Sequence, residues 1–267
     1  MIKSIRGVSY HIDIHGEGAP LLLLHGFTGS LNDWDEMLPL LQGYTLIRID
    51  LIGHGKTEAP ENDARYTMQE VCKDLARLLD ELELPKISLA GYSMGGRTAL
   101  CFAAAYPERV ERLILESASP GLKTAKEREA RRESDVLLAE RILSEGVASF
   151  IGHWEKQPLF ASQEKLSEEK KAFIRAQRLA NRPEGLSNSL KGMGTGSQPN
   201  LWDELGKSEL QVLIMAGELD SKFCKIGKDM NERFKYSQYI EVKEAGHAIH
   251  VEQPRLFGTI VNGFLKQ

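Results

Sequence analysis

A serine set between two glycines is the first feature of this chain that could perform chemistry. The stretch Gly91-Tyr92-Ser93-Met94-Gly95 fits the pattern G-x-S-x-G. It follows a short apolar run at 86–90, which indicates a buried strand, and it precedes an apolar helix-forming run at 98–105. That strand–turn–helix context distinguishes a reactive serine on a strained turn from a chance match. Only glycine leaves room on both sides of such a turn, so Ser93 is the candidate nucleophile or base.

Two acid–base side chains follow Ser93 in the order that such a serine requires. Asp220 comes just after the apolar run 210–217, and His247 comes after the run 237–242. In a serine triad the histidine takes the proton of the hydroxyl, and the carboxylate fixes the tautomer and orientation of the imidazole. The order Ser, Asp, His, with each residue beyond the carboxyl end of a strand, predicts a triad of Ser93, Asp220 and His247.

Each partner of the serine has a rival nearby. Glu218 lies two residues before Asp220, but the turn after the strand favours Asp220 as the acid. Asp50 also follows a strand, yet it precedes the serine in the chain, which is the wrong order for the triad acid. His250 competes with His247, and the glycine directly before His247 favours the latter. We expect His250 to be a structural residue or to face an overlying segment.

Backbone amides are predicted to stabilise negative charge that develops beside Ser93. Met94 begins the helix after the serine, where N–H groups lack helical acceptors and the helix dipole favours an anion. A His-Gly pair follows the apolar run 21–24. Such a pair matches the loop that supplies the second oxyanion donor, here the amide of Phe27. We expect His25 and His54 to stabilise turns.

The elements that must position these groups alternate between strands and helices. That alternation predicts an α/β class with a mostly parallel, doubly wound sheet. Between 121 and 196 the chain has no strand-like run, and its charged, helical spacing predicts a helical cap. We therefore expect a core formed by 1–120 and 197–267, with the cap inserted over the carboxyl ends of the strands, where ligands bind in this architecture.

Composition limits the other classes of function. The net charge of −4 argues against nucleic-acid binding, which requires a basic face. The three cysteines, Cys72, Cys101 and Cys224, lack the spacing of a disulfide framework or a zinc site. The glycines at 194 and 196 lack the strand and helix that a phosphate-binding loop requires. We expect neither a cofactor nor a metal.

The location of the protein is also an expectation from the residues. The first seven residues are too polar for a signal peptide, and no apolar run approaches the roughly 18 residues of a membrane span. These features predict a cytoplasmic, reduced protein without a membrane span. The sequence defines no oligomeric state, and a monomer is the default expectation.

Five motifs in the core and the cap together support a resemblance. They are Gly91–Arg97 (GYSMGGR), Ser119–Lys123 (SPGLK), His153–Phe160 (HWEKQPLF), Gly194–Pro199 (GTGSQP) and Ala245–His247 (AGH). Along nearly its whole length the chain resembles the α/β-hydrolase superfamily. More narrowly, it resembles the 2-succinyl-6-hydroxy-2,4-cyclohexadiene-1-carboxylate synthases (the MenH family) of menaquinone biosynthesis. Because these motifs cover both predicted parts, the match is more specific than G-x-S-x-G alone.

The resemblance implies a carbon–oxygen lyase in a hydrolase fold. In that family 2-succinyl-5-enolpyruvyl-6-hydroxy-3-cyclohexene-1-carboxylate loses pyruvate by 2,5-elimination, and no water is consumed. The resemblance also implies that Tyr92, Arg131, Trp154 and a third arginine, matched to Arg178, bind the substrate. Arg97 fits independently, because it lies one helical turn after the serine and a guanidinium binds carboxylates through two parallel hydrogen bonds.

Two other functions remain open at this level. A carboxylesterase or carbon–carbon bond hydrolase of the same fold would share the triad and the oxyanion amides, and only Arg97 and the cap motifs favour the lyase. A non-enzymatic receptor or scaffold is disfavoured by the complete triad. Within the lyase reading, His247 is expected to deprotonate Ser93, and Ser93 to remove the ring proton directly or through water.

Overall fold

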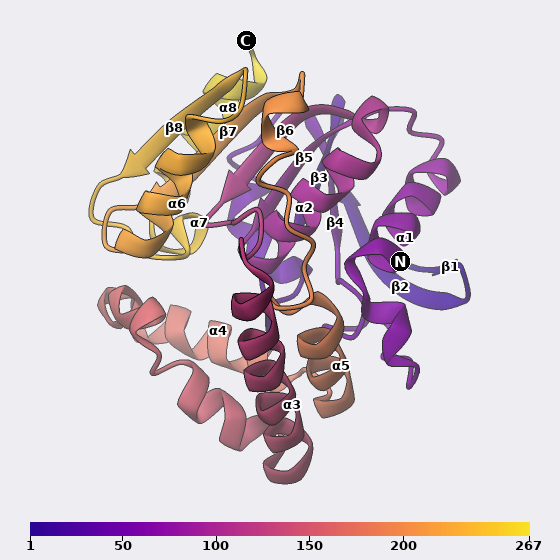
Figure 1. Cartoon of the computed structure of the whole chain (residues 1–267). Helices are drawn as coiled ribbons and strands as arrows, with labels where there is room; N and C mark the ends of the chain where they lie inside the picture. The colour runs from indigo at the N-terminus through magenta and orange to yellow at the C-terminus, as the bar shows by residue number, and fades with distance from the viewer.

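The computed structural model describes all residues, 1–267, and is built on one eight-stranded sheet (Figure 1). The strands are β1 (Ile2–Ile5), β2 (Val8–His15), β3 (Ala19–Leu24), β4 (Tyr44–Ile49), β5 (Ile87–Tyr92), β6 (Val110–Glu116), β7 (Gln211–Gly217) and β8 (Ser237–Val242). Their order is β1-β2-β4-β3-β5-β6-β7-β8. The pairs β1–β2 and β2–β4 are antiparallel, and every other pair is parallel. The predicted α/β class with a mostly parallel sheet is confirmed.

Helices cover both faces of the sheet. They are α1 (Met68–Glu81), α2 (Met94–Ala105), α3 (Ala125–Trp154), α4 (Glu168–Leu179), α5 (Pro183–Met193), α6 (Ser221–Asn231), α7 (Ile249–Glu252) and α8 (Pro254–Leu265). Five 3₁₀ segments join them: η1 (Leu31–Met37), η2 (Asp63–Tyr66), η3 (Pro107–Arg109), η4 (Pro158–Lys165) and η5 (Leu205–Lys207). Helices α1, α2 and α6 pack on one face, and η1 and α8 pack on the other.

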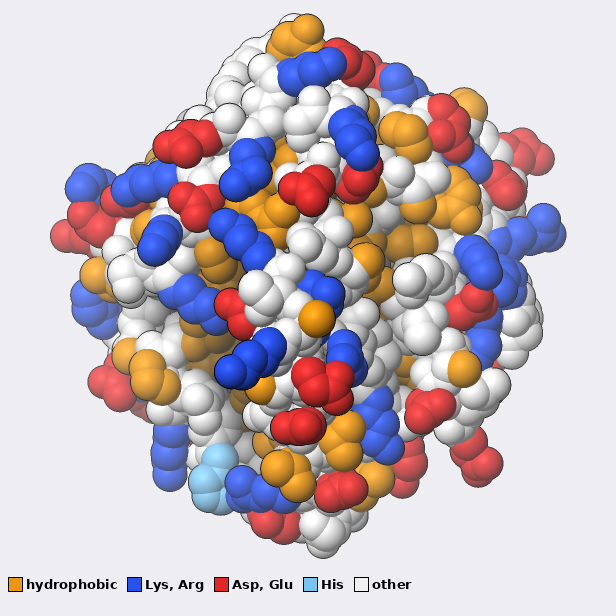
Figure 2. Space-filling view, viewed as in Figure 1, with side chains coloured by type: hydrophobic (Ala, Val, Ile, Leu, Met, Phe, Trp, Pro, Cys, Tyr) orange, Lys and Arg blue, Asp and Glu red, His pale blue; other side chains and the backbone are white.

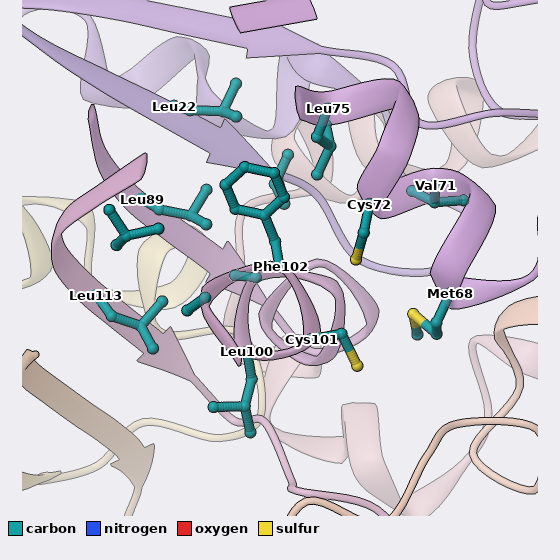
Figure 3. Close-up of a cluster of buried hydrophobic side chains, with 14 of the residues drawn as sticks. Leu22, Met68, Val71, Cys72, Leu75, Leu89, Leu100, Cys101, Phe102 and Leu113 are labelled. Atoms are coloured by element: carbon teal, nitrogen blue, oxygen red, sulfur yellow. The ribbon is translucent and has the colours of Figure 1, made fainter. Parts of the chain in front are cut away.

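Strand β3 shows why the central runs are continuously apolar. Leu22 and Leu24 belong to the larger core cluster, on the α1 and α2 side, whereas Leu21 and Leu23 belong to the cluster on the opposite side. Successive side chains of a strand point to opposite faces, so a strand covered on both sides needs apolar residues at every position. In the larger cluster, Phe102 of α2 lies between strand leucines and α1 (Figure 3).

Helices α3, α4 and α5 lie together below the sheet, at the end away from the C-terminus (Figure 1). Helices α3 and α5 share a small apolar cluster of their own, which includes Ile142 and Leu186. Polar contacts attach this helical part to the loops after β3, since Asn181 Nδ2 donates to the Thr28 carbonyl at 2.8 Å. The division into a core and a cap at 121–196 stays our interpretation of this arrangement.

The structure adds elements that the sequence patterns did not indicate. Strand β1 and helix α6 were not expected. The charged pattern at 123–150 forms α3, which is interrupted where Gly146 adopts a φ of 83°. A left-handed residue cannot continue a right-handed helix, so this glycine allows the chain to change direction there.

The surface carries both signs of charge. Lys and Arg side chains alternate with Asp and Glu over the face shown in Figure 2, with apolar side chains between them. This face therefore presents no continuous basic surface. None of the helices combines the length and the apolar composition needed to cross a membrane.

Candidate active site

Ser93 occupies a sharp turn between β5 and α2. Its backbone angles, φ 52° and ψ −107°, are strained for a residue with a side chain. A Cβ added to Gly91 would lie 2.3 Å from the Gly95 carbonyl oxygen, and one added to Gly95 would lie 2.1 Å from that of Leu24. Both glycines are thus required by close backbone contacts, as the sequence argument expected.

The structure brings Ser93, His247 and Asp220 into one hydrogen-bonded chain. The Ser93 Oγ and His247 Nε2 atoms are 2.9 Å apart, and His247 Nδ1 lies 2.6 Å from Asp220 Oδ2. Because Nδ1 faces a carboxylate, it carries the ring proton, and Nε2 is free to accept the serine proton. Asp220 also caps α6, since its other oxygen accepts from the Phe223 amide at 3.3 Å. The imidazole itself is buried.

The rival acids have other roles. Glu218 accepts hydrogen bonds from Lys243 Nζ at 2.6 Å and from the Glu244 amide at 3.1 Å, on the exposed side of the strand end. Asp50 accepts from the amides of Leu31 and Lys56, at 2.7 and 2.8 Å. It therefore holds together the loops that follow β3 and β4 and does not contact His247.

His250 is a buried structural residue. Its Nδ1 lies 2.8 Å from Glu116 at the end of β6, and its ring stacks on Trp34 with centroids 4.4 Å apart. Its ring also packs beside Tyr92, at 4.8 Å. The structural role expected for His250 agrees with this position, beneath the residue that precedes Ser93.

The two predicted oxyanion amides are available for a ligand. The N–H groups of Phe27 and Met94 donate to no other group in the chain. Both residues line the same cavity as Ser93. Since a buried amide without an acceptor is costly, two such donors beside Ser93 are suited to an oxygen that gains charge during a reaction.

That cavity, of about 200 Å³, is rich in positive charge. It is enclosed by residues at the edge of the sheet and by residues of the helical part, including Trp154, Leu159 and Phe160. Three cationic side chains, Arg97, Arg131 and Lys222, line it, and no carboxylate does. A cavity wall with cations and no acids indicates an anionic ligand.

Arg97 has no carboxylate partner. Its Nη1 donates to the Met193 carbonyl at 2.6 Å and lies 3.4 Å from Gln198 Oε1. Burial, together with the charge of the nearby Arg131, lowers the pKa of Arg97 to about 10. The guanidinium is therefore still charged at neutral pH. Arg97 is half-buried, and a cation withdrawn from water is costly unless it is paired, so the missing partner is best supplied by a ligand.

Arg131 is held through one edge of its guanidinium. Its Nε donates to Asp135 Oδ1 at 2.8 Å, four residues further along α3. Asp135 is buried, and its second oxygen has no hydrogen-bond partner. Because the Nε edge is occupied, the two Nη groups remain free to bind a carboxylate.

Tyr92 and Trp154 both line the cavity, as predicted. The Tyr92 ring contacts the His247 ring, with centroids 5.3 Å apart. Trp154 stacks on Phe150 at 5.5 Å, and its indole Nε1 is buried without an acceptor. The indole N–H of Trp154 therefore has no acceptor within the chain, while the residue itself forms part of the cavity wall.

The structure does not bring Arg178 into the cavity wall. Its guanidinium lies over the ring of Phe160, 4.8 Å from the centroid, and its Nη2 is 3.4 Å from Gln163 Oε1. Phe160 itself lines the cavity. Arg178 therefore supports the wall from behind by a cation–π contact, and it would reach a ligand only if Phe160 moved.

Among the wall residues that were not predicted from the sequence are two on helix α6. Lys222 and Phe223 line the cavity from the first turn of α6, and the Phe223 ring lies 4.7 Å from the His247 ring. The signal that could have revealed them is the N-cap of α6. Asp is a favoured N-cap residue, and the Asp220 side chain accepts from the Phe223 amide, three residues later. The two residues after the triad acid then face the site.

His25 and His54 stabilise the loops, as expected. His25 Nε2 accepts from the Leu51 amide at 2.9 Å, and its Nδ1 donates to the Gly26 carbonyl at 2.7 Å. His54 is fully buried, and its Nδ1 donates to the Ile52 carbonyl at 3.0 Å. Burial and the nearby His25 lower the pKa of His54 to about 3.

The buried His54 predicts a loss of stability in mild acid. An unfolded histidine has a pKa near 6.5, so between about pH 6.5 and 3 the unfolded chain binds a proton that the folded chain excludes. We expect the free energy of unfolding to fall by about 1.4 kcal/mol per pH unit below 6.5 from this residue. Urea denaturation at pH 7.5 and at pH 5.0 gives the free energy of unfolding at each pH. The decrease between the two pH values should be smaller in His54→Asn than in the wild type. Equal differences in the two proteins would contradict this role.

Comparison with known proteins agrees with this geometry. A family model described as the alpha/beta hydrolase fold matches residues 19–254. A Bacillus subtilis (strain 168) protein, provisionally named 2-succinyl-6-hydroxy-2,4-cyclohexadiene-1-carboxylate synthase, is 49% identical over 97% of this chain and 95% of its own length. A protein from Escherichia coli O7:K1, named 2-succinyl-6-hydroxy-2,4-cyclohexadiene-1-carboxylate synthase, is 31% identical over 90% of this chain and 92% of its own length.

A solved structure is similar over almost the whole chain. The structure of MenH from S. aureus superposes with a TM-score of 0.92 at 36% identity, covering 96% of this chain and 98% of that one. The shared features therefore include the helical part formed by α3, α4 and α5 as well as the sheet itself. Together with the relatives above, this shows that the chain belongs to the 2-succinyl-6-hydroxy-2,4-cyclohexadiene-1-carboxylate synthase family, within the α/β-hydrolase fold.

Proposed function

We propose that this protein is the lyase that converts 2-succinyl-5-enolpyruvyl-6-hydroxy-3-cyclohexene-1-carboxylate into 2-succinyl-6-hydroxy-2,4-cyclohexadiene-1-carboxylate and pyruvate in menaquinone biosynthesis. The names of the relatives support this reaction. The observation that carries it is the cavity, in which a Ser–His–Asp arrangement lies near three cations, and only Arg131 among them has a carboxylate partner in the chain. The substrate has three carboxylates, on the ring, the succinyl arm and the enolpyruvyl group, so it supplies the missing negative charge.

In the proposed mechanism Ser93 starts the elimination. His247 accepts the hydroxyl proton, and the serine oxygen removes the ring proton at C2, next to the succinyl ketone. The electron pair forms the C2=C3 bond, the ring double bond moves to C4=C5, and the C5–O bond breaks. The leaving enolpyruvate becomes pyruvate when it is protonated. The amides of Phe27 and Met94 stabilise the charge that develops on the ketone oxygen.

The substrate is held by residues from both parts of the chain. We assign carboxylate binding to Arg97 from the core and to Arg131 from the helical segment, with Tyr92 and Trp154 as further contacts. This assignment is supported by the shared cavity that all four line. Because residues of the helical segment form part of this cavity, we interpret 121–196 as a cap over the site. A cap that excludes water would favour elimination over hydrolysis.

The proposed reaction also implies which ligand the protein binds and where it acts. The partner is a small polycarboxylate, and the chemistry as written uses neither a metal nor a cofactor. We place the enzyme in the cytoplasm and expect it to act as a monomer. Its three cysteines are all free and buried, which suits a reducing compartment.

The test is a direct measurement of pyruvate release. The purified protein is added to the enolpyruvyl substrate, generated in situ by the enzyme that forms it, and pyruvate is followed with lactate dehydrogenase and NADH. We expect release far above the spontaneous rate and poor cleavage of p-nitrophenyl acetate. Fast ester cleavage with pyruvate release at the spontaneous rate would instead identify a hydrolase.

Asp135 is expected to matter for substrate binding although it does not line the cavity. Asp135→Asn keeps an oxygen near Arg131 Nε but removes the charge, and charge-assisted hydrogen bonds are about twice as strong as neutral ones. With Arg131 less well oriented, we expect the KM for pyruvate release to rise by about tenfold and kcat to change little.

A matched control for Asp135→Asn exists on the same helix. Arg141 and Glu145 form a second ion pair with i, i+4 spacing on α3, exposed and outside the cavity. Glu145→Gln should leave both kinetic constants unchanged. If the two variants behave alike, Asp135 does not position Arg131.

A further inference from the structure

The first turns of α6 form a distinct wall of the cavity. Lys222, Phe223 and Ile226 line it, and the Phe223 ring packs against His247. The Lys222 ammonium lies 5.5 Å from the centroid of the Phe223 ring, at the exposed side of this wall. This wall therefore presents apolar surface beside the triad and a cation at its outer end.

Lys222 differs from the other lysines of α6. Lys228 pairs with Glu241 at 2.8 Å, outside the cavity. Lys225 is exposed and does not line the cavity. Lys222 does line it and forms no ion pair with any carboxylate of the chain, so its ammonium is available to a bound anion.

We propose that Lys222 binds the terminal carboxylate of the substrate's succinyl arm. This inference rests on the proposed function. From the ring outward the arm consists of a ketone, two methylene groups and a carboxylate. With the ketone oxygen at the Phe27 and Met94 amides, beside Ser93, the methylenes pack on Phe223 and Ile226, and the carboxylate meets the ammonium. Apolar surface followed by a cation is the order of groups that such an arm requires.

The charges in the cavity agree with this assignment. Arg97 and Arg131 lie close enough for the charge of Arg131 to act on Arg97. They enter from α2 and α3, whereas Lys222 enters from α6. The two arginines can thus serve the ring and enolpyruvyl carboxylates, and the third carboxylate is left for the third cation.

Two unreactive aromatic ligands isolate the arm carboxylate. 2-Succinylbenzoate carries the whole arm, whereas 2-acetylbenzoate has the ketone and the ring carboxylate but lacks the arm carboxylate. Binding of each ligand would be measured by titration calorimetry to the wild type, Lys222→Met, Lys222→Arg and Lys225→Met. We expect Lys222→Met to bind 2-succinylbenzoate about tenfold more weakly and 2-acetylbenzoate unchanged. Lys222→Arg should retain most of the affinity, and Lys225→Met should match the wild type.

The outcomes separate this inference from the proposed function. A loss in Lys222→Met that both ligands share, or equal affinity of the wild type for both, would overturn the role of Lys222. Pyruvate release by the wild type tests the reaction separately, so an active enzyme with an insensitive Lys222 disproves only this inference. The KM for the substrate provides a second readout: an increase of about tenfold in Lys222→Met supports the assignment, and an unchanged KM overturns it.

Discussion

Ser93→Ala is expected to slow pyruvate release by about 10³-fold, because a positioned acid–base group contributes roughly 10²–10⁴ to a proton transfer. The Ser93 Oγ is the only hydroxyl within hydrogen-bond distance of His247 Nε2, at 2.9 Å. Without it the imidazole has no relay to the ring proton. Substrate binding should change little, because the cationic side chains and the aromatic walls remain. Initial rates over a range of substrate concentrations should show the loss in kcat.

A second variant tests whether the serine and histidine act together. If His247 works through Ser93, then His247→Ala and the double variant Ser93→Ala/His247→Ala should each lose about as much activity as Ser93→Ala alone. Losses that multiply in the double variant would mean that the two residues act independently, and the mechanism proposed above would then be wrong. Binding of the product to each variant checks that the cavity is intact.

The triad could be predicted because its determinants are local or follow from topology. Gly91 and Gly95 are fixed by backbone contacts within the turn and with the neighbouring strand. Parallel strands end at the same edge of the sheet, so residues that directly follow β5, β7 and β8 approach one another. The order of the three residues in the chain then identifies the serine, the acid and the base.

The cavity walls were harder to predict because side-chain packing determines them. The resemblance matches Arg178 to a substrate-binding arginine by its position in the sequence, but it does not predict where the side chain points. In the structure the Arg178 guanidinium stacks on Phe160. Lys222 was missed because helix α6, which begins directly after Asp220, was not predicted. The counterion of Arg131, Asp135, was also missed. The spacing of four residues along α3 allows an ion pair, but it shows that the pair lies at the cavity only once the buried face of α3 is known.

Arg97→Met is expected to abolish most of the activity without weakening the fold. Removing one partner of a desolvated charge pair costs about 2–5 kcal/mol, so kcat/KM for pyruvate release should fall by about 10²-fold or more. The folded protein holds this cation without a carboxylate, which is why burial lowers its pKa to about 10. Replacing a poorly compensated, partly buried charge by an apolar side chain of similar length is often neutral or stabilising. Thermal unfolding should therefore occur at or above the wild-type temperature.

Arg48→Met provides the opposite case in the same molecule. Arg48 is buried, whereas Arg97 is half-buried, and Arg48 is paired with both Asp13, at 2.6 Å, and Asp35. Its replacement should lower stability by about 2 kcal/mol, because the buried Leu31 carbonyl loses a donor and two partly exposed carboxylates lose their partner. Arg48 does not line the cavity. At temperatures where the variant is folded, kcat/KM should stay close to the wild-type value. Were Arg97→Met to lose as much stability as Arg48→Met, Arg97 would be a structural residue, and the missing counterion would not be the substrate.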